Sequence, residues 1–405
     1  MGDYVVRCAG CMSKLPLHAL TCPLDGSLPR AEYSSVQLKP RALPGIWKFH
    51  DWLPVTGIIE GAGEGSVTYK STGLAAALDL DNLYISFSGY WPERNARMRT
   101  CSFKGLEAPP TMQRKREMDD KSTMVVASAG NTARAFAEVA SITGQKLVLV
   151  VPESAISRLW VTVEPGPVIV VGVDGDYYQA IEIADRLTSC PGYLPEGGAR
   201  NIARRDGMGT VMLQAALAMR CLPHHYFQAV GSGTGGISAW EAAMRLVGDG
   251  RFGRNLPRLH LAQNLPNAPI YYAWTGKEPG PVSQVMYDDV LFNRRPPYSV
   301  AGGVKDALEA TDGRVYGVTD WEAAMAKALY EESEGIDILN APAVAIAALV
   351  QAVESRLVSK DDIILLNITG GGVARLKEEM DIVALKCDIV VSDPEELMNF
   401  MEGRA

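Results

Sequence analysis

Residues Tyr226-Phe227-Gln228-Ala229-Val230 are followed at once by Gly231-Ser232-Gly233-Thr234-Gly235-Gly236 and then by Ile237-Ser238-Ala239-Trp240. The first five residues are largely apolar, as in a buried strand, and the last four begin a helical pattern. A strand, a glycine-rich loop and a helix in this order form a cradle for phosphate, because the helix N-terminus offers free N–H groups. The stretch therefore predicts an α/β fold that binds a phosphate group.

The same alternation of strands and helices continues along the chain from about residue 80. Alternating strands and helices form parallel sheets that are covered by helices. We expect strands at residues 83–87, 124–127, 146–151, 168–173, 226–230, 259–263, 315–318 and 363–368. We expect helices at residues 132–143, 236–247, 320–334 and 343–356, with Asn131 capping the first, and an irregular loop at 276–297.

Lys104 is a candidate for covalent chemistry. It follows Ser102 and Phe103 and precedes residues that begin a helix. Most lysines are solvated, so this position means little by itself. A Schiff-base lysine needs a sheltered place at the end of an element, and the motifs that follow Lys104 make that interpretation the better one.

Two further motifs lie directly after predicted strands. Ser128-Ala129-Gly130-Asn131-Thr132 leads into a helix, where backbone N–H groups favour a carboxylate. The side chain of Asn131 can donate to a phenolic oxygen on a cofactor ring. Thr369 follows the last predicted strand and precedes Gly370-Gly371-Gly372.

The four motifs together predict that the chain holds pyridoxal 5'-phosphate. Lys104 is the predicted catalytic residue and forms the Schiff base, and the loop that starts at Gly231 holds the phosphate. The neutral hydroxyl of Thr369 cannot keep the pyridine nitrogen protonated, whereas an aspartate there would favour aminotransfer. The hydroxyl therefore favours elimination or replacement at the β-carbon of an amino acid.

In this order the motifs resemble the fold-type II pyridoxal-phosphate enzymes, which have the tryptophan synthase β fold, and threonine synthase most broadly. The resemblance runs from about residue 65 to residue 375. It implies two parallel-sheet α/β domains with a cofactor cleft between them. It also implies that the cofactor contacts Lys104, Asn131, Gly231, Ser232, Gly233, Thr234, Gly235 and Thr369, and that the substrate contacts Ser128, Ala129, Gly130, Thr132 and Arg134.

The sequence departs from threonine synthases around the lysine. Gly105-Leu106-Glu107 replaces the usual Asp-Arg, and Ser71-Thr72-Gly73-Leu74 stands where Thr-Pro-Leu is usual. This pattern resembles the cysteate synthases, a methanogen branch of the family. The resemblance implies replacement of the phosphate of O-phosphoserine by sulfite, on a route to coenzyme M. Threonine synthase and an O-phosphoserine-dependent cysteine synthase are the alternatives.

The expected substrates carry two anions besides a carboxylate, so the site needs positive charge. Arg134 lies in the first turn of a predicted helix, where the helix dipole disfavours a cation by about 0.3–1 kcal/mol. We hypothesise that Arg134 binds phosphate or sulfite, the alternative being a solvated arginine on the outer face. Arg204 and Arg205 are further candidate cations.

The first thirty residues form a separate module that resembles a zinc ribbon. Cys8, Cys11 and Cys22 supply three ligands, and Asp25 stands where a fourth cysteine is usual. Carboxylates bind zinc, so these four residues form a predicted metal site, with a metal-free knuckle as the alternative. We predict domains at residues 1–30, at 31–110 with 224–405 (the larger, cofactor-binding domain), and at 111–223 (the smaller, substrate-binding domain).

Composition limits the partners. The 405 residues carry a formal net charge of −8, which argues against nucleic acid or an anionic membrane as a partner. No apolar run reaches the roughly 20 residues that a membrane span needs. Seven cysteines, an odd number, argue against a disulfide framework. We expect a cytoplasmic location, because the N-terminal residues show no charged-then-apolar signal pattern. We expect small anionic substrates and a homo-oligomer.

Two other function classes compete with this interpretation. Gly231, Gly233 and Gly236 also match a dinucleotide fingerprint, but the acidic residue near the required distance, Asp249, is predicted to lie in a loop and not at a strand end. The second class is a regulatory protein that keeps the fold but catalyses no reaction. The retained Lys104 argues against it.

Overall fold

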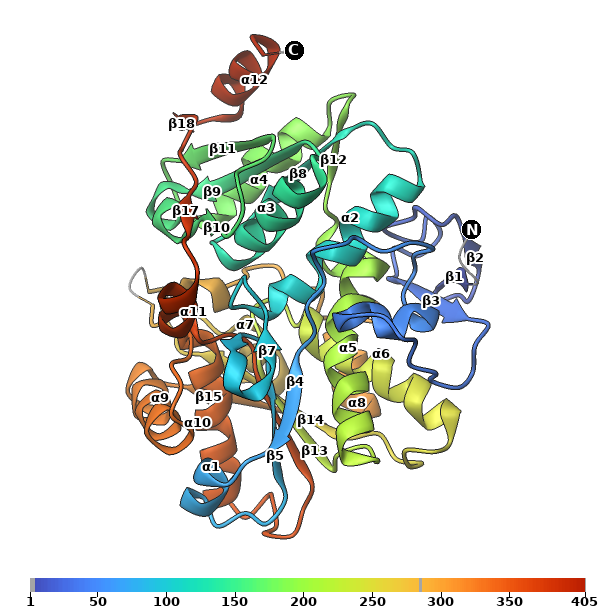
Figure 1. The fold of residues 1–405 in the computed structure, drawn as a ribbon, viewed down its shortest axis with the longest axis vertical. Coiled ribbons are helices and arrows are strands. Elements are labelled where there is room, and N and C mark those ends of the chain that lie inside the picture. Colours follow the sequence, from blue (N-terminus) through green and yellow to red (C-terminus); the bar gives the residue numbers. More distant parts are fainter. Residues whose placement is uncertain (1–3, 284–285, 405) are drawn as a thin grey trace.

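Two sheets form the framework of the computed structural model, which describes residues 4–283 and 286–404 (Figure 1). The larger sheet has the strand order β15-β14-β13-β16-β5-β4, and its pairs are parallel except the antiparallel pair of β4 with β5. Its strands are β4 (Val67–Lys70), β5 (Leu83–Phe87), β13 (His225–Ala229), β14 (Arg258–Asn264), β15 (Arg314–Val318) and β16 (Ile364–Ile368).

The smaller sheet is entirely parallel and has the order β12-β8-β9-β11-β18. Its strands are β8 (Thr123–Ala127), β9 (Leu147–Pro152), β11 (Val168–Val173), β12 (Tyr193–Pro195) and β18 (Ile389–Val391). The chain thus returns at its C-terminal end to the smaller sheet, where β18 lies beside β11 (Figure 1). The predicted boundary differs here, because residues 224–405 were all assigned to the larger domain.

Helices cover both faces of the larger sheet, which explains its continuous apolar strands. In β13, Tyr226 packs in one core with Ile237 of α6 (Thr234–Asp249), and Phe227 packs in the other core with Val344 of α10 (Asn340–Glu354). The remaining α-helices are α1 (Gly73–Ala77), α2 (Ala108–Glu117), α3 (Asn131–Thr143), α4 (Tyr177–Thr188), α5 (Ile202–Met219), α7 (Pro269–Thr275), α8 (Val304–Ala310), α9 (Asp320–Glu334), α11 (Val373–Glu379) and α12 (Pro394–Glu402).

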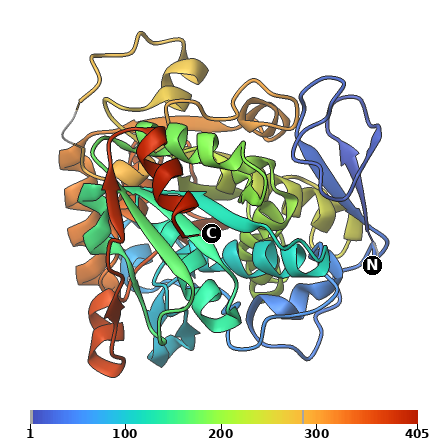
Figure 2. The same ribbon diagram turned by 90° about the horizontal axis from the view of Figure 1, so that it is seen from above.

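The N-terminal module is a small antiparallel sheet in the order β2-β1-β3, which Figure 2 shows in blue at one side of the molecule. Its strands are β1 (Tyr4–Cys8), β2 (Lys14–Leu15) and β3 (Pro29–Tyr33), so it extends slightly past the predicted end at residue 30. Arg205 of α5 fixes it to the larger domain, because its guanidinium donates to the carbonyl oxygen of Pro29 and to the carboxylate of Glu241. The α5 helix packs against α6, although residues 111–223 were assigned to the smaller domain.

The predicted elements agree closely with the structure where buried periodicity is strong. The strands at 83–87 and 168–173 and the helix at 320–334 have the predicted bounds, and the ends of the other predicted strands differ by no more than one residue. The predicted loop at 276–297 contains only the short 3-10 turn η6 (Asp289–Leu291) among its described residues; positions 284–285 lie outside them. Within the described residues, no helix has the length and apolarity needed to cross a membrane.

Three strand ends position the predicted motifs. Ser128 follows β8 directly, Gly231 lies two residues after the end of β13, and Thr369 follows β16 directly. In open parallel sheets, ligands bind outside the carboxyl ends of the strands. The fold therefore presents these three motifs on binding edges of its two sheets.

Candidate active site

The loop that bears Lys104 is joined by backbone hydrogen bonds to the loop after β16. Lys104 lies in the 3-10 turn η3 (Phe103–Leu106), whose start is capped by the Ser102 hydroxyl. The N–H of Phe103 donates to the carbonyl oxygen of Thr369 at 2.9 Å, and Ser102 forms an antiparallel bridge with Gly370. Two of the predicted motifs are therefore held in one piece of backbone structure.

The amine of Lys104 lies in a buried charge cluster. Burial lowers the pKa of Lys104, while the carboxylate of Glu107 at 3.6 Å from Nζ acts to raise it. The same Glu107 oxygen accepts from Nε of Arg204 at 3.0 Å, and the guanidinium also pairs with Glu196. Burial opposes the charge of Arg204, but the two carboxylates outweigh it and raise the pKa of its guanidinium. The lowered pKa of Lys104 increases the fraction of neutral amine, the form that reacts.

Ser128 shapes the loop at the start of α3. Its hydroxyl oxygen accepts from the N–H groups of Gly130 at 3.0 Å and Ala133 at 3.1 Å. Gly130 has φ 139°, in the region that favours glycine, and it precedes the first helical residue. Asn131 was predicted to cap this helix, but it is the first residue inside it. The Ser128 hydroxyl accepts in the place of the expected asparagine cap.

Arg134 is buried, so the alternative of a solvated outer-face arginine is wrong. Its Nε donates to the carbonyl oxygen of Thr100 at 2.9 Å, and its Nη2 donates to Oδ1 of Asn131 at 3.1 Å. Its guanidinium lies over the ring of Trp160. Burial lowers the pKa of Arg134 to about 10, so it stays charged at neutral pH. Because Arg134 occupies Oδ1 of Asn131, Nδ2 is the group that remains for a ligand.

The glycine-rich loop follows β13 as predicted. Gly233 has φ 80° and precedes the first residue of α6. A Cβ at Gly235 would lie 2.0 Å from Nε2 of Gln228, which is itself buried. The first N–H groups of a helix have no intrahelical acceptor, so this end of α6 suits an anion.

Asp249 does not supply the acidic residue of a dinucleotide site. It is the last residue of α6, about 22 Å along the helix axis from Thr234 at 1.5 Å per residue. Its carboxylate accepts from the N–H of Leu38 at 2.6 Å and pairs with Arg251. The acidic residue that a dinucleotide site requires at the end of its second strand is therefore not supplied by Asp249.

One cavity brings the four motifs together, and we call it the inner cavity. Lys104, Asn131, Ser232 and Thr369 all line it. So do the other predicted cofactor- and substrate-binding residues, with Arg134 as the exception. The set offers an amine for an aldehyde, a helix N-terminus for a phosphate, an amide for a phenolic oxygen and a hydroxyl for a ring nitrogen. These groups fit pyridoxal phosphate.

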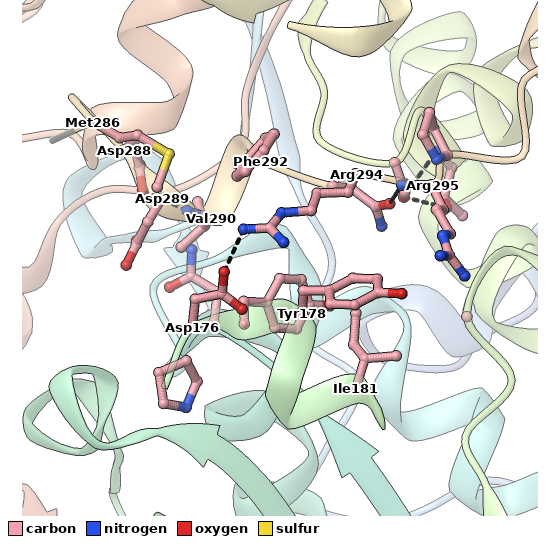
Figure 3. Close-up of a pocket in the computed structure, with 18 of the residues that line it drawn as sticks. Asp176, Tyr178, Ile181, Met286, Asp288, Asp289, Val290, Phe292, Arg294 and Arg295 are labelled. Carbon is pink, nitrogen blue, oxygen red and sulfur yellow. Dashed lines mark hydrogen bonds and ion pairs between the residues drawn. The ribbon is translucent and has the colours of Figure 1, made fainter. Parts of the chain in front are cut away.

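A second cavity of about 1870 Å³, the outer cavity, continues outward from this region and includes Arg134 in its wall. Residues 286–300 cover part of it, and Figure 3 shows the ion pair of Arg294 in that segment with Asp176 at the start of α4. Arg158 pairs in the same way with Asp289 and also donates to the carbonyl oxygen of Ala129 at 3.1 Å. Two ion pairs thus link the larger domain to the smaller one.

Sequence reasoning did not identify three residues of this region. Tyr177 lines both cavities and begins α4 behind the capping box of Asp176 and Gln179, a pattern visible in the sequence. Glu107 was noted only as a departure from a motif, and Arg158 carried no signal because its partner Asp289 is distant in sequence. Contacts between segments far apart in sequence are outside the reach of local patterns.

The four predicted metal ligands lie together in the N-terminal module. One ligand atom from each of Cys8, Cys11, Cys22 and Asp25 lies within 4.8 Å of all the others. The sulfurs of Cys11 and Cys22 are 3.7 Å apart, and Cys8 Sγ is 3.3 Å from Oδ1 of Asp25. Tetrahedral zinc with Zn–S bonds of about 2.3 Å places two sulfurs about 3.8 Å apart. The donor set and its spacing therefore fit zinc.

Comparisons with known proteins agree with this site. Residues 78–370 match the family described as pyridoxal-phosphate dependent enzyme. A cysteate synthase of Methanothrix thermoacetophila is 60% identical, over 99% of both chains. A cysteate synthase of Methanosarcina acetivorans is 51% identical, over 98% of both chains.

Solved structures share the fold at low identity. Maize serine racemase superposes with a TM-score of 0.59 at 16% identity, covering 84% of this chain and 92% of that one. Threonine deaminase isoform 2 of Solanum lycopersicum gives a TM-score of 0.58 at 18% identity, covering 77% of this chain and 86% of that one. With the inner cavity and the close relatives, these findings establish that the chain belongs to the cysteate synthase family of pyridoxal-phosphate-dependent enzymes.

Proposed function

We propose that this chain replaces the phosphate of O-phospho-L-serine with sulfite, giving L-cysteate and inorganic phosphate for a route to coenzyme M. The family membership supports this reaction. The observation that carries the proposal is the inner cavity, where Lys104 and the hydroxyl-bearing Thr369 meet. A lysine with a neutral partner for the ring nitrogen suits replacement at the β-carbon.

When bound, pyridoxal phosphate supplies an electron sink for negative charge at the substrate's α-carbon. The residues from Gly231 to Gly235 and the start of α6 would hold its phosphate. Nδ2 of Asn131 would donate to its phenolic oxygen, because Oδ1 is occupied by Arg134. The hydroxyl of Thr369, which lines the inner cavity, would pair with its pyridine nitrogen.

The smaller domain binds the amino acid. The N–H groups of residues 128–132 hold its carboxylate at the start of α3. Nζ of Lys104 takes the proton from the α-carbon and later returns it to the same carbon. At the β-carbon the C–O bond breaks, and its electron pair leaves on phosphate. The sulfur lone pair of sulfite then forms the C–S bond of cysteate.

A product assay tests the reaction. The purified holoenzyme receives O-phosphoserine with sulfite, O-phosphoserine with sulfide, or O-phosphohomoserine with water, and Lys104→Ala serves as the blank in each series. We expect cysteate and phosphate in equal amounts from the first pair. Cysteine from the second pair, or threonine from the third, as the faster product would replace the proposal with one of the two alternatives.

We also propose that Cys8, Cys11, Cys22 and Asp25 bind one zinc ion. The sulfur spacing supports this, and so do the N–H groups of Gly10 and Cys11, which donate to Cys8 Sγ at 3.3 Å and stabilise a thiolate. Elemental analysis of the purified chain should give one zinc per chain for the wild type and for Cys190→Ser, a cysteine outside the cluster. Cys22→Ser should lose the zinc, and equal zinc in both variants would reject the site.

Two further expectations remain proposals. Self-association is supported by Trp321 and Met325, which lie one turn apart on α9 with 71% and 55% of their surface exposed. A cytoplasmic location is supported by the seven cysteines, none of which forms a disulfide in the structure. Light scattering at increasing concentration tests self-association, with Trp321→Glu as the variant expected to reduce the mass.

A further inference from the structure

We infer that Arg204, together with Tyr177, binds the oxyanion at the β-carbon of the substrate, first the departing phosphate and then the entering sulfite. This inference rests on the proposed function and adds the residues that recognise its two inorganic anions. It replaces Arg134, the arginine that the sequence favoured.

The position of Arg204 distinguishes it from the other arginines around the site. In the part of the chain that the structure describes, it is the one arginine that lines both the inner and the outer cavity. It lies in the first turn of α5 and only 8% of its surface is exposed. The helix dipole disfavours a cation there, so the position has a cost that a ligand contact would explain.

The other arginines of the outer cavity wall are engaged or remote. Arg134 donates to Thr100 and Asn131, Arg158 pairs with Asp289, and Arg294 pairs with Asp176. Arg200 and Arg295 line the outer cavity but not the inner one. Arg204 is therefore the guanidinium next to Lys104.

Two carboxylates that do not line the inner cavity hold Arg204. Nε donates to Glu107 at 3.0 Å and Nη1 donates to Glu196. Glu107 is fully buried and lines neither cavity, and Glu196 lines only the outer one. Among residues 4–283 and 286–404, no group accepts a hydrogen bond from Nη2 of Arg204, so its two hydrogens are available to a ligand.

Tyr177 supplies a second donor. It lines both cavities beside Arg204, and its hydroxyl has no hydrogen-bond partner among the described residues. The pKa of Tyr177 is raised to about 12 by burial, so the phenol keeps its proton at neutral pH. A phenol and a guanidinium edge suit an anion with several oxygens.

Phosphate and sulfite present the same type of surface to these donors. The phosphate ester presents three terminal oxygens on phosphorus and sulfite has three oxygens on sulfur, and each anion occupies the β-substituent side of the substrate in turn. Glu107 lies 3.6 Å from Nζ of Lys104 and 3.0 Å from Nε of Arg204, so one carboxylate links the reacting amine to the anion site. Because Glu107 and Glu196 neutralise the guanidinium, we expect weak binding that lets phosphate leave.

Steady-state kinetics of the holoenzyme test the inference. Arg204→Lys keeps the charge but loses the flat double donor, and Tyr177→Phe removes only a hydroxyl. We expect Arg204→Lys to raise the KM for sulfite and the inhibition constant for inorganic phosphate by about tenfold, with a smaller change in kcat. Tyr177→Phe should raise both by about threefold to tenfold. Arg200→Lys, in the outer wall only, is the matched control and should change neither.

The outcomes separate this inference from the proposed function. A wild type that makes no cysteate removes the proposed function. The inference is then tested by the rise in melting temperature that inorganic phosphate causes in the holoenzyme, which should be smaller in Arg204→Lys than in Arg200→Lys. A wild type that makes cysteate while Arg204→Lys and Tyr177→Phe keep both constants unchanged overturns the inference alone. An equal change in Arg200→Lys also overturns it. If Arg204→Lys does not fold, Tyr177→Phe decides.

Discussion

The backbone N–H of Phe103 donates to the carbonyl oxygen of Thr369, with 2.9 Å between nitrogen and oxygen. The two residues are far apart in sequence. Phe103 directly precedes Lys104, and Thr369 itself has a proposed role at the cofactor. The bond fixes the loop that carries the amine of Lys104 against the loop that carries the hydroxyl of Thr369. The relative position of these two loops is thus held by a backbone hydrogen bond.

Replacement of Thr369 tests the role of the hydroxyl. Thr369→Ala removes the hydroxyl while the backbone bond to Phe103 remains, so we expect kcat for cysteate formation to fall about tenfold, the effect of one lost hydrogen bond. Thr369→Ser keeps the hydroxyl and should stay within about threefold of the wild type. Equal kcat values for the two variants in the cysteate assay would contradict this role.

Replacement of Gly235 tests the phosphate loop. A Cβ in Gly235→Ala would meet the side chain of Gln228, whose Oε1 accepts from the hydroxyl of Tyr226 at 2.7 Å. We expect a loss of about 1–3 kcal/mol in the free energy of unfolding and weaker binding of pyridoxal phosphate. Gly248→Ala in the same helix meets nothing within 4 Å and should be neutral or stabilising. Urea unfolding and cofactor titration measure both effects, and equal results for the pair would reject the packing argument.

Replacement of Arg134 tests whether this residue positions Asn131. Arg134→Ala removes four contacts of a buried cation, so we expect the free energy of unfolding to fall by about 2 kcal/mol or more. The exposed Arg186→Ala should change it by less than about 0.5 kcal/mol. An unfolding free energy for Arg134→Ala equal to that of the wild type would contradict the positioning role. The predicted anion-binding role of Arg134 is tested separately. Unchanged KM values of Arg134→Ala for O-phosphoserine and for sulfite would reject that role.

Two histidines form a buried pair at the start of the larger sheet. His225 is the first residue of β13, one residue before the predicted strand, and its Nδ1 is 2.9 Å from Nε2 of His260. Nδ1 of His260 is 2.7 Å from the hydroxyl of Tyr316, and Nε2 of His225 is 3.2 Å from Asp362. Burial, the neighbouring His225 and the cation of Arg258 hold the pKa of His260 well below its usual range.

This pair predicts a loss of stability in mild acid. His260 stays neutral in the folded chain, whereas the unfolded chain takes up a proton below a pKa of about 6.5. The unfolded state then binds more protons, so the free energy of unfolding should fall by about 1 kcal/mol per pH unit below 6.5. His260→Gln should flatten this slope between pH 8 and pH 5.5 in urea unfolding, and the exposed His18→Gln should not. A steep slope that persists in His260→Gln would show that other groups cause it.

The sequence predicted the elements and the cofactor motifs because both depend on local patterns. Residues 231–235 and 128–132 follow strands whose apolar runs identify them, and the structure gathers both with Lys104 in one cavity. The boundary of the smaller domain was harder to predict from the sequence. The strand β18 joins β11 through pairing of residues about 220 positions apart, which no local pattern encodes.

The partners of charged side chains were also beyond local reasoning. The sequence favoured Arg134 as the anion-binding residue, although Arg134 and Arg204 both lie in first turns of helices. The distinction depends on distant carbonyl and carboxylate groups, at Thr100 for the first and Glu107 for the second. A guanidinium already bound to backbone and one with a free edge look the same in sequence.

Reduction of the holoenzyme with borohydride, followed by peptide mapping, tests the central claim most directly. The account predicts one pyridoxyl group per chain, attached to the peptide that contains Lys104. It also predicts no attachment in Lys104→Ala. A pyridoxyl group on another lysine, or none in a preparation that makes cysteate, would contradict the account.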